Sequence, residues 1–191
     1  MQRLPSFALF LLASLIVLLS ASCDPDDCPD GFIGIDPADA SGADVHWRIT
    51  SFVNTPSGPT SSIVILDEFE NTYDVGENEL VTVVLFATDN ESGIRTIDVT
   101  GGFGFSCQEG DGSIILGSGS FPGNPFSFGG SMTCGAPEAA YQVTEFTGSD
   151  FCVGPDRTFR GATYGLDGIA ENNVDILSLT RLTINVNPTE L

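Results

Sequence analysis

Positive charge is the feature that this sequence of 191 residues has least of. It contains six arginines and no lysine against 26 acidic residues, which gives a formal net charge of −20 at pH 7. A protein that binds nucleic acid needs a basic patch for the phosphates, so this composition argues against a nucleic acid partner. The absence of lysine also excludes a phosphate-binding loop of the Gly-Lys-Ser/Thr type. We therefore expect a soluble, strongly acidic body.

Histidine is almost absent as well, since His46 is the only one, and no Cys-x-x-Cys or Cys/His pattern occurs. These absences argue against a zinc site. Without a second histidine to share a metal, we interpret His46 as an ordinary strand residue, the alternative being a general base or a ligand. Its neighbour Trp47, the only tryptophan, is expected in the core, and a sugar-stacking platform is the alternative.

Motifs of enzyme active sites are missing too. The chain has no Gly-x-Ser-x-Gly nucleophile elbow. Carboxylate pairs such as Asp67 and Glu68 are expected by chance among so many acidic residues. We therefore predict that the protein is not an enzyme, and the remaining catalytic alternative is a secreted hydrolase with carboxylate acid–base catalysis.

A long hydrophobic run occurs once, at the N-terminus. Arg3 precedes an apolar run over residues 7–19, and the small residues Ser20-Ala21-Ser22 follow it. This order predicts a signal peptide over residues 1–22. Its apolar run of 13 residues is short of the roughly 20 that a membrane-spanning helix needs.

The residue after the predicted cleavage point is Cys23. The preceding Leu-Ser-Ala-Ser resembles a bacterial lipobox, although Ser20 stands where that motif has leucine. The resemblance implies lipidation of Cys23 and attachment to a membrane of the bacterial cell envelope. Ordinary signal-peptidase cleavage and secretion is the alternative.

Five cysteines in an exported chain leave one odd thiol, which lipidation of Cys23 would account for. The other four, Cys28, Cys107, Cys134 and Cys152, can then form two disulfides in an oxidising compartment. Three pairings are possible. We favour Cys107 with Cys134, which would close a Gly/Ser-rich loop, and Cys28 with Cys152, which would tie the N-terminal segment to the body.

Residues 23–43 are rich in Asp, Pro and Gly and poor in large apolar side chains. This composition predicts a solvated tether ahead of a folded domain over residues 44–191. Calcium binding is the alternative, because clustered carboxylates suit a hard cation. The fragment Asp26-Asp27-Cys28-Pro29-Asp30 faintly resembles one copy of a thrombospondin type 3 repeat, which binds calcium.

The strongest strand signals lie on either side of a polar turn at residues 89–93. Residues 80–87 are apolar or threonine and rich in valine, which predicts a central strand. Residues 94–100 alternate between apolar and polar, as a half-buried antiparallel strand does. We expect these two strands to form a hairpin. Its tip offers the best candidate calcium ligands, Asp89, Asn90 and Glu91.

Further extended runs occupy much of the remaining chain. Prolines between the runs 45–53 and 61–69 predict that a strand ladder would be interrupted there. The Gly/Ser/Phe-rich region 103–135 is unsuited to helices. Its phenylalanine pairs, 103 with 105 and 126 with 128, each project to one face, which predicts core residues or, as the alternative, an exposed aromatic binding face. The runs are 45–53, 61–69, 113–116, 127–133, 139–146, 160–170 and 177–186.

Two groups of residues carry a family resemblance. The first is Ala87, Asp89, Ser92, Gly93 and Ile94, and the second is Tyr164, Leu166, Ala170 and Asn172. Together they are similar to the bacterial immunoglobulin-like and fibronectin-type-III-like modules of secreted proteins. The resemblance covers roughly residues 44–186 and implies an all-β, antiparallel immunoglobulin-like β-sandwich. The chain exceeds the roughly 100 residues of such a sandwich, and we place the enlargement between residues 101 and 160.

These observations together predict a non-catalytic cell-envelope lipoprotein. Such modules imply adhesion, spacing or ligand binding, so a protein or a glycan is the expected partner of the sandwich. A carbohydrate- or calcium-binding module is the second hypothesis. No cofactor is expected, calcium being the one ion considered.

Overall fold

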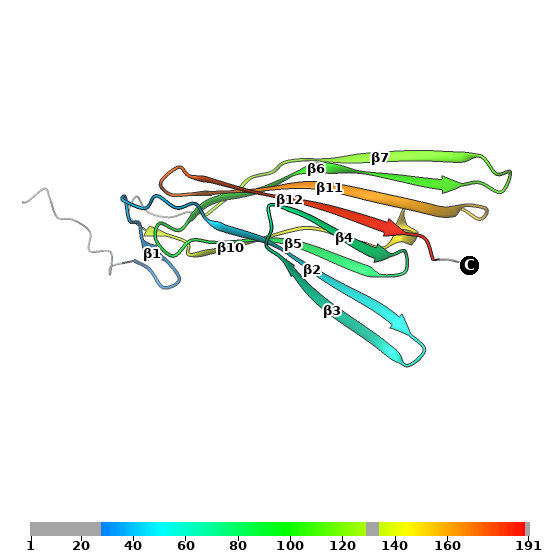
Figure 1. Ribbon diagram of the computed structural model, residues 1–191, viewed down its shortest axis with the longest axis horizontal. Coiled ribbons are helices and arrows are strands. Elements are labelled where there is room, and N and C mark those ends of the chain that lie inside the picture. The colour runs from blue at the N-terminus through cyan, green and yellow to red at the C-terminus, as the bar shows by residue number, and fades with distance from the viewer. Residues whose placement is uncertain (1–27, 129–133, 190–191) are drawn as a thin grey trace, which may run out of the picture.

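The computed structural model describes residues 28–128 and 134–189, and this part of the chain is an all-β sandwich of two packed sheets (Figure 1). The predicted signal peptide and Cys23 lie outside the described residues. Residues 129–133, where one predicted strand ends, also lie outside them.

The smaller layer is a four-stranded antiparallel sheet. Its order is β10 (Glu138–Phe146), β5 (Leu80–Thr88), β2 (Asp44–Thr55) and β3 (Gly58–Leu66). The predicted strand at residues 80–87 is confirmed and lies inside the sheet, between β10 and β2. Its side chains alternate between buried and half-buried, so both faces are largely covered.

The larger layer is a six-stranded sheet. Its order is β4 (Glu70–Gly76), β12 (Leu177–Asn187), β11 (Thr158–Asn172), β6 (Ile94–Gln108) and β7 (Ile114–Pro122), and the short β8 (Phe126–Ser127) also pairs with β6. All of these pairs are antiparallel except β4 with β12, which is parallel. A separate two-stranded ladder joins β1 (Ile33–Gly34) to β9 (Cys134–Gly135).

The core lies between the inner faces of the two sheets. Trp47 and Leu85 are fully buried on the smaller sheet, and Leu182 and Ile184 face them from the larger one. The expectation that Trp47 is a core residue is confirmed. The alternation in residues 94–100 is confirmed, because the apolar residues there are buried and the polar ones are not. In residues 177–186 it is confirmed at Leu182, Ile184 and Val186, which are buried, whereas Leu177 and Leu179 are exposed.

The predicted hairpin of residues 80–87 with 94–100 is wrong. β5 belongs to the four-stranded sheet and β6 to the six-stranded sheet, so the turn between them is an arch that crosses from one layer to the other. Gly93 makes the crossing with φ +72°, and a Cβ there would lie 2.7 Å from the Cα of Gly135. Only glycine fits so close an approach of two backbones at a positive φ.

The expected interruption at the prolines is also wrong. β2 and β3 form a hairpin whose ladder continues to Thr55 and Gly58, with Pro59 opposite Asn54. β3 is an edge strand, where a proline is tolerated because the strand lacks a neighbour on its outer side. Residues 61–66 of the predicted run 61–69 belong to β3, and residues 67–69 form the turn before β4, a strand that the sequence pattern did not reveal.

The favoured disulfide pairing is wrong, although all four cysteines are paired. The structure joins Cys28 to Cys134 and Cys107 to Cys152, with Cα atoms 5.7 and 5.8 Å apart. Ala136, close to Cys134, bridges to Ile94 at the start of β6, whereas Cys107 lies near the end of that strand. At about 3.3 Å per residue these positions are about 40 Å apart, so Cys107 cannot reach Cys134.

The described part of the expected tether, residues 28–43, is docked on the sandwich. The Cys28–Cys134 disulfide and the β1–β9 ladder hold it, and Ala43 is buried. Asp36 N–H donates to the carbonyl of Glu91. The acidic composition suggested solvation, but the Asp39 carboxylate accepts hydrogen bonds from Ser92 and Asn172 of the domain. A boundary at residue 44 therefore does not separate a free segment from the folded body.

Candidate functional site

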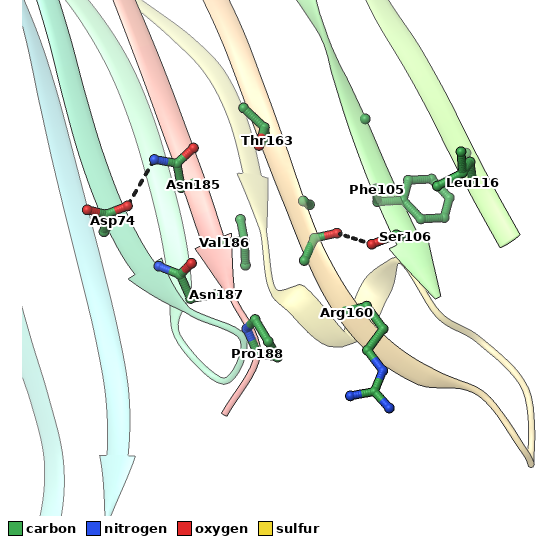
Figure 2. Close-up of a pocket in the computed structure, with 14 residues that line it drawn as sticks. Asp74, Phe105, Ser106, Leu116, Arg160, Thr163, Asn185, Val186, Asn187 and Pro188 are labelled. Atoms are coloured by element: carbon green, nitrogen blue, oxygen red, sulfur yellow. Dashed lines mark hydrogen bonds between the residues drawn. The ribbon is translucent and has the colours of Figure 1, made fainter. Parts of the chain in front are cut away.

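A shallow trough of about 610 Å³ lies on the outer face of the six-stranded sheet, away from the core. Five strands contribute to it, with Asp74 from β4, Asn185 from β12, Thr163 from β11, Ser106 from β6 and Leu116 from β7 (Figure 2). Arg160 and Pro188 lie at the same end of the sheet. The trough is open to solvent along its length.

The register of the strands places small polar residues in rows across this face. Asp74 is opposite Asn185, Asn185 is opposite Thr163, and Thr163 is opposite Gly104. Because side chains alternate between the faces of a strand, the next residues of the same face lie two positions away. They form a parallel row of Thr72, Thr183, Gly165, Gly102 and Ser120.

Glycines keep the floor of this face flat. A Cβ at Gly165 would meet no atom within 4 Å, and a Cβ at Gly104 would meet only the carbonyl of Gly117, at 3.9 Å. Packing therefore does not require glycine at either position, and φ is not in the left-handed region at either. The consequence is a face on which a ligand can approach the backbone of β6 and β11.

Hydrogen bonds fix some of the side chains in the trough. Asn185 Nδ2 donates to Asp74 Oδ1 at 2.9 Å, which orients the amide along the row. Ser106 Oγ donates to the carbonyl of Gly161 at 3.4 Å (Figure 2). Arg160 donates to Gln108, so the guanidinium is engaged at the end of the trough. The resulting surface carries amide and hydroxyl groups beside the exposed apolar side chain of Leu116.

The chemistry of the trough is that of neutral hydrogen bonding. Asp74 is the one carboxylate among its described lining residues, and Arg160 is the one cation. Glycoside hydrolysis uses two carboxylates on either side of the bond. The trough therefore lacks the pair that a carboxylate hydrolase requires, whereas side-chain amides and hydroxyls match the hydroxyl groups of a sugar.

The predicted calcium ligands lie elsewhere, at the arch between β5 and β6. Asp89 is buried, whereas Asn90 and Glu91 are exposed. In the described ranges no three His, Cys, Asp or Glu side chains converge as a metal site would require. Calcium binding at these residues stays a prediction, and the geometry gives it no support.

Asp89 is instead a centre of structural hydrogen bonds. Its Oδ1 accepts from the backbone N–H groups of Glu91, Ser92 and Gly93 at 2.8–3.2 Å. Its Oδ2 accepts from Ser92 Oγ at 3.2 Å and from Asn172 Nδ2 at 3.1 Å. The two halves of the sequence motif, Asp89 to Ile94 and Tyr164 to Asn172, thus meet at this carboxylate.

The docked N-terminal segment joins the same network. Asp39 Oδ2 accepts from Ser92 Oγ at 2.7 Å and from Asn172 Nδ2 at 3.3 Å. Hydrogen bonds from Ser41 and Ser92 lower the pKa of Asp39 from 3.8 to about 2. The Asp39 carboxylate thus helps to hold this segment to the domain.

The remaining candidates have structural surroundings. His46 stacks on Phe86 with ring centroids 5.4 Å apart. The guanidinium carbon of Arg48 also lies over the Phe86 ring, 4.3 Å from its centroid. Asp67 and Glu68 are exposed in the turn between β3 and β4. The carbonyl of Glu68 accepts from Asn71 and Thr180 there, so this segment closes the turn.

The phenylalanine pairs divide between the two interpretations. Phe103, Phe105 and Phe128 pack against the core, as expected of core residues, whereas Phe126 is 56% exposed. The trough itself was missed by sequence reasoning. The sequence feature that could have indicated it is the alternation in residues 177–186, whose polar residues Thr183 and Asn185 face away from the core.

No protein-family model matches this chain, and no curated protein matches it in sequence. Within residues 28–128 and 134–189, no helix is long and apolar enough to cross a membrane.

Proposed function

We propose that this chain is a non-catalytic lipoprotein of the bacterial cell envelope, and that its immunoglobulin-like sandwich binds a neutral glycan in the trough on the six-stranded sheet. The observation that carries the binding proposal is the pair of rows of hydroxyl, amide and glycine residues across five strands. In a chain with a net charge of −20, the first row carries one charged side chain, Asp74, and the second row carries none.

Neutral sugars suit such a surface better than charged ligands do. Their hydroxyl groups both donate and accept, as do the side chains of Thr163 and Asn185. A strand face without bulky side chains also lets an extended chain of sugars lie along β6 and β11. An anionic polymer would meet the acidic body of the protein and lose affinity.

Three observations support export and anchoring. The sequence has a signal peptide pattern followed by Cys23. The four other cysteines form two disulfides, and one of them joins Cys28, the first described residue, to Cys134 of the domain. Disulfides persist in oxidising compartments outside the cytoplasm. Lipidation of Cys23 would leave only a few residues between the membrane anchor and the domain, so the sandwich would lie close to the membrane surface.

A glycan array tests the binding proposal. The mature protein, residues 23–191, is applied to neutral oligosaccharides, and we expect binding that Gly104→Tyr abolishes by filling the trough. Asn185→Ala is expected to weaken binding about tenfold, because a hydrogen bond to a ligand contributes about 1 kcal/mol and Asp74 loses its donor. Ser61→Tyr, on the exposed edge strand of the other sheet, is the matched control and is expected to leave binding unchanged. Equal binding by Gly104→Tyr and the wild type would contradict the trough as the site.

Intact mass of the protein from bacterial membranes tests the anchor. We expect a mass above that of residues 23–191 by an acylated glyceride, with four thiols that alkylate only after reduction. An unmodified chain would mean secretion instead.

A further inference from the structure

A second cavity, of about 400 Å³, opens between the two sheets at the end of the sandwich that carries the Cys107–Cys152 disulfide. Six aromatic rings line it, from Phe103 and Phe105 on β6, Phe121 on β7, Phe146 on β10, Phe151 after the 3-10 helix Gly148–Asp150, and Tyr164 on β11. The other lining residues are Thr144, Glu145 and Asp150. It lies on the inner side of the six-stranded sheet, whereas the glycan trough lies on the outer side.

The rings form one continuous aromatic wall. Phe151 lies 5.2 Å from Phe105 and 5.8 Å from Phe103, measured between ring centroids, and Phe103 lies 5.3 Å from Tyr164. Phe146 and Tyr164 are buried, whereas Phe103, Phe105, Phe121 and Phe151 are half-buried. Four rings therefore have part of their surface available to a ligand.

Glycines of the neighbouring strand hold two of these rings in place. A Cβ at Gly117 or Gly119 would overlap the rings of Phe105 and Phe103, respectively. The two rings thus occupy the space that side chains at Gly117 and Gly119 would fill. The wall is built into the register of β6 and β7 rather than formed by mobile side chains.

The charged groups at this cavity are all negative. Glu145 and Asp150 carry carboxylates, and no arginine is among the described lining residues. The Asp150 carboxylate is oriented by Thr147, whose N–H donates to Asp150 Oδ2 at 2.8 Å. The Glu145 carboxylate accepts from Thr82 Oγ1 at 3.2 Å on the outer face of the four-stranded sheet, so it points away from the cleft. Burial, and then the charge of Asp150, raise the pKa of the Tyr164 phenol, so the field of that carboxylate reaches the aromatic wall.

We propose that this aromatic cleft binds a quaternary ammonium group, with the cation against the rings and the Asp150 carboxylate at the rim. The faces of aromatic rings attract cations, and aromatic cages with this chemistry recognise choline-like groups. A fatty acid or another anion would meet Asp150 and be repelled. A sugar would find few partners, because only Thr144 and Tyr164 offer hydroxyl groups among the lining residues.

The test compares choline with its neutral carbon isostere, 3,3-dimethylbutan-1-ol, by NMR titration of the mature, disulfide-bonded protein. We expect choline to shift the aromatic resonances of Phe151 and Tyr164 saturably in the millimolar range, and the isostere to shift them at least about tenfold more weakly. No saturable shift with choline would overturn the proposal. Equal affinity for the isostere would overturn it too, because the cleft would then be an apolar pocket without preference for a cation.

Variants locate the site. Phe151→Leu keeps an apolar side chain and is expected to weaken choline binding about tenfold through the lost ring face. The isosteric variant Asp150→Asn is expected to weaken it at least about threefold while leaving the unfolding temperature near that of the wild type. Asn185→Ala, in the trough, is the matched control and should bind choline as the wild type does. Unchanged binding by both cleft variants would overturn the assignment of the cleft.

Discussion

Gly168 on β11 and Trp47 on β2 pack against each other between the two sheets. A Cβ at Gly168 would lie 2.9 Å from Cζ2 of the Trp47 indole and 2.8 Å from a methyl group of Leu85. Trp47 is fully buried, so the ring has no room to move away. The largest side chain of the core is thus accommodated by a missing side chain on the opposite sheet.

Gly168→Ala is therefore expected to lower the free energy of unfolding by about 1–3 kcal/mol, through overpacking of the core. Urea denaturation checks this value. Gly165→Ala, three residues away on the same strand, is the control. It faces open space and is expected to be neutral or to stabilise by up to about 1 kcal/mol, because alanine restricts the unfolded chain. A Gly168→Ala protein as stable as Gly165→Ala would contradict this packing.

The buried side chain of Asn172 forms hydrogen bonds to five other residues, and we expect its removal to destabilise the fold. Its Nδ2 donates to Asp39, Asp89 and the carbonyl of Ser41, and its Oδ1 accepts from the N–H groups of Val174 and Ile176. Asn172→Ala is expected to cost about 2–4 kcal/mol, because buried donors and acceptors lose their partners. Thermal unfolding measures the loss, and Asn90→Ala at the exposed tip of the arch is the control, expected within about 0.5 kcal/mol of the wild type.

Peptide mapping without reduction is expected to recover two disulfide-linked pairs, Cys28 with Cys134 and Cys107 with Cys152. Replacing Cys107 and Cys152 together by serine is expected to lower stability by about 2–4 kcal/mol, since the disulfide restrains the unfolded chain over 45 residues. A peptide that links Cys107 to Cys134 would contradict the strand order at β6.

Docking of residues 28–43 is expected to weaken in strong acid. The pKa of Asp39 is lowered to about 2 by its hydrogen bonds, so the ionised carboxylate stabilises the docked state above its ordinary pKa of 3.8. This contribution is lost as the pH falls through about 2. NMR titration of the Asp39 carboxyl carbon checks the value, and Asp39→Asn should remove the dependence. A midpoint near 3.8 would show that the segment is not held through this residue.

Much of the sandwich follows from local pattern. β5 and β12 were predicted within one residue at each end, because runs of β-branched residues and period-2 alternation report how each strand is buried. β4 was missed because the inward-facing Asn71 is polar, so its alternation in burial has no matching alternation of apolar and polar residues. In the glycine-rich middle region the predicted run 113–116 lies at the start of β7, which continues to Pro122, and the extension of β6 to Gln108 was not predicted.

What the sequence determined by itself is the class of fold, the faces of the strands and the presence of disulfides. These depend on residues close together in the chain, on side-chain periodicity and on the number of cysteines. Only the tertiary structure decided that β5 and β6 belong to different sheets, that Cys28 joins Cys134, and that Asp89 meets Asn172 across 83 residues. Each of these depends on which strands are neighbours in space. Period-2 alternation shows which side of a strand faces the core, and it carries no information about which strand lies beside it.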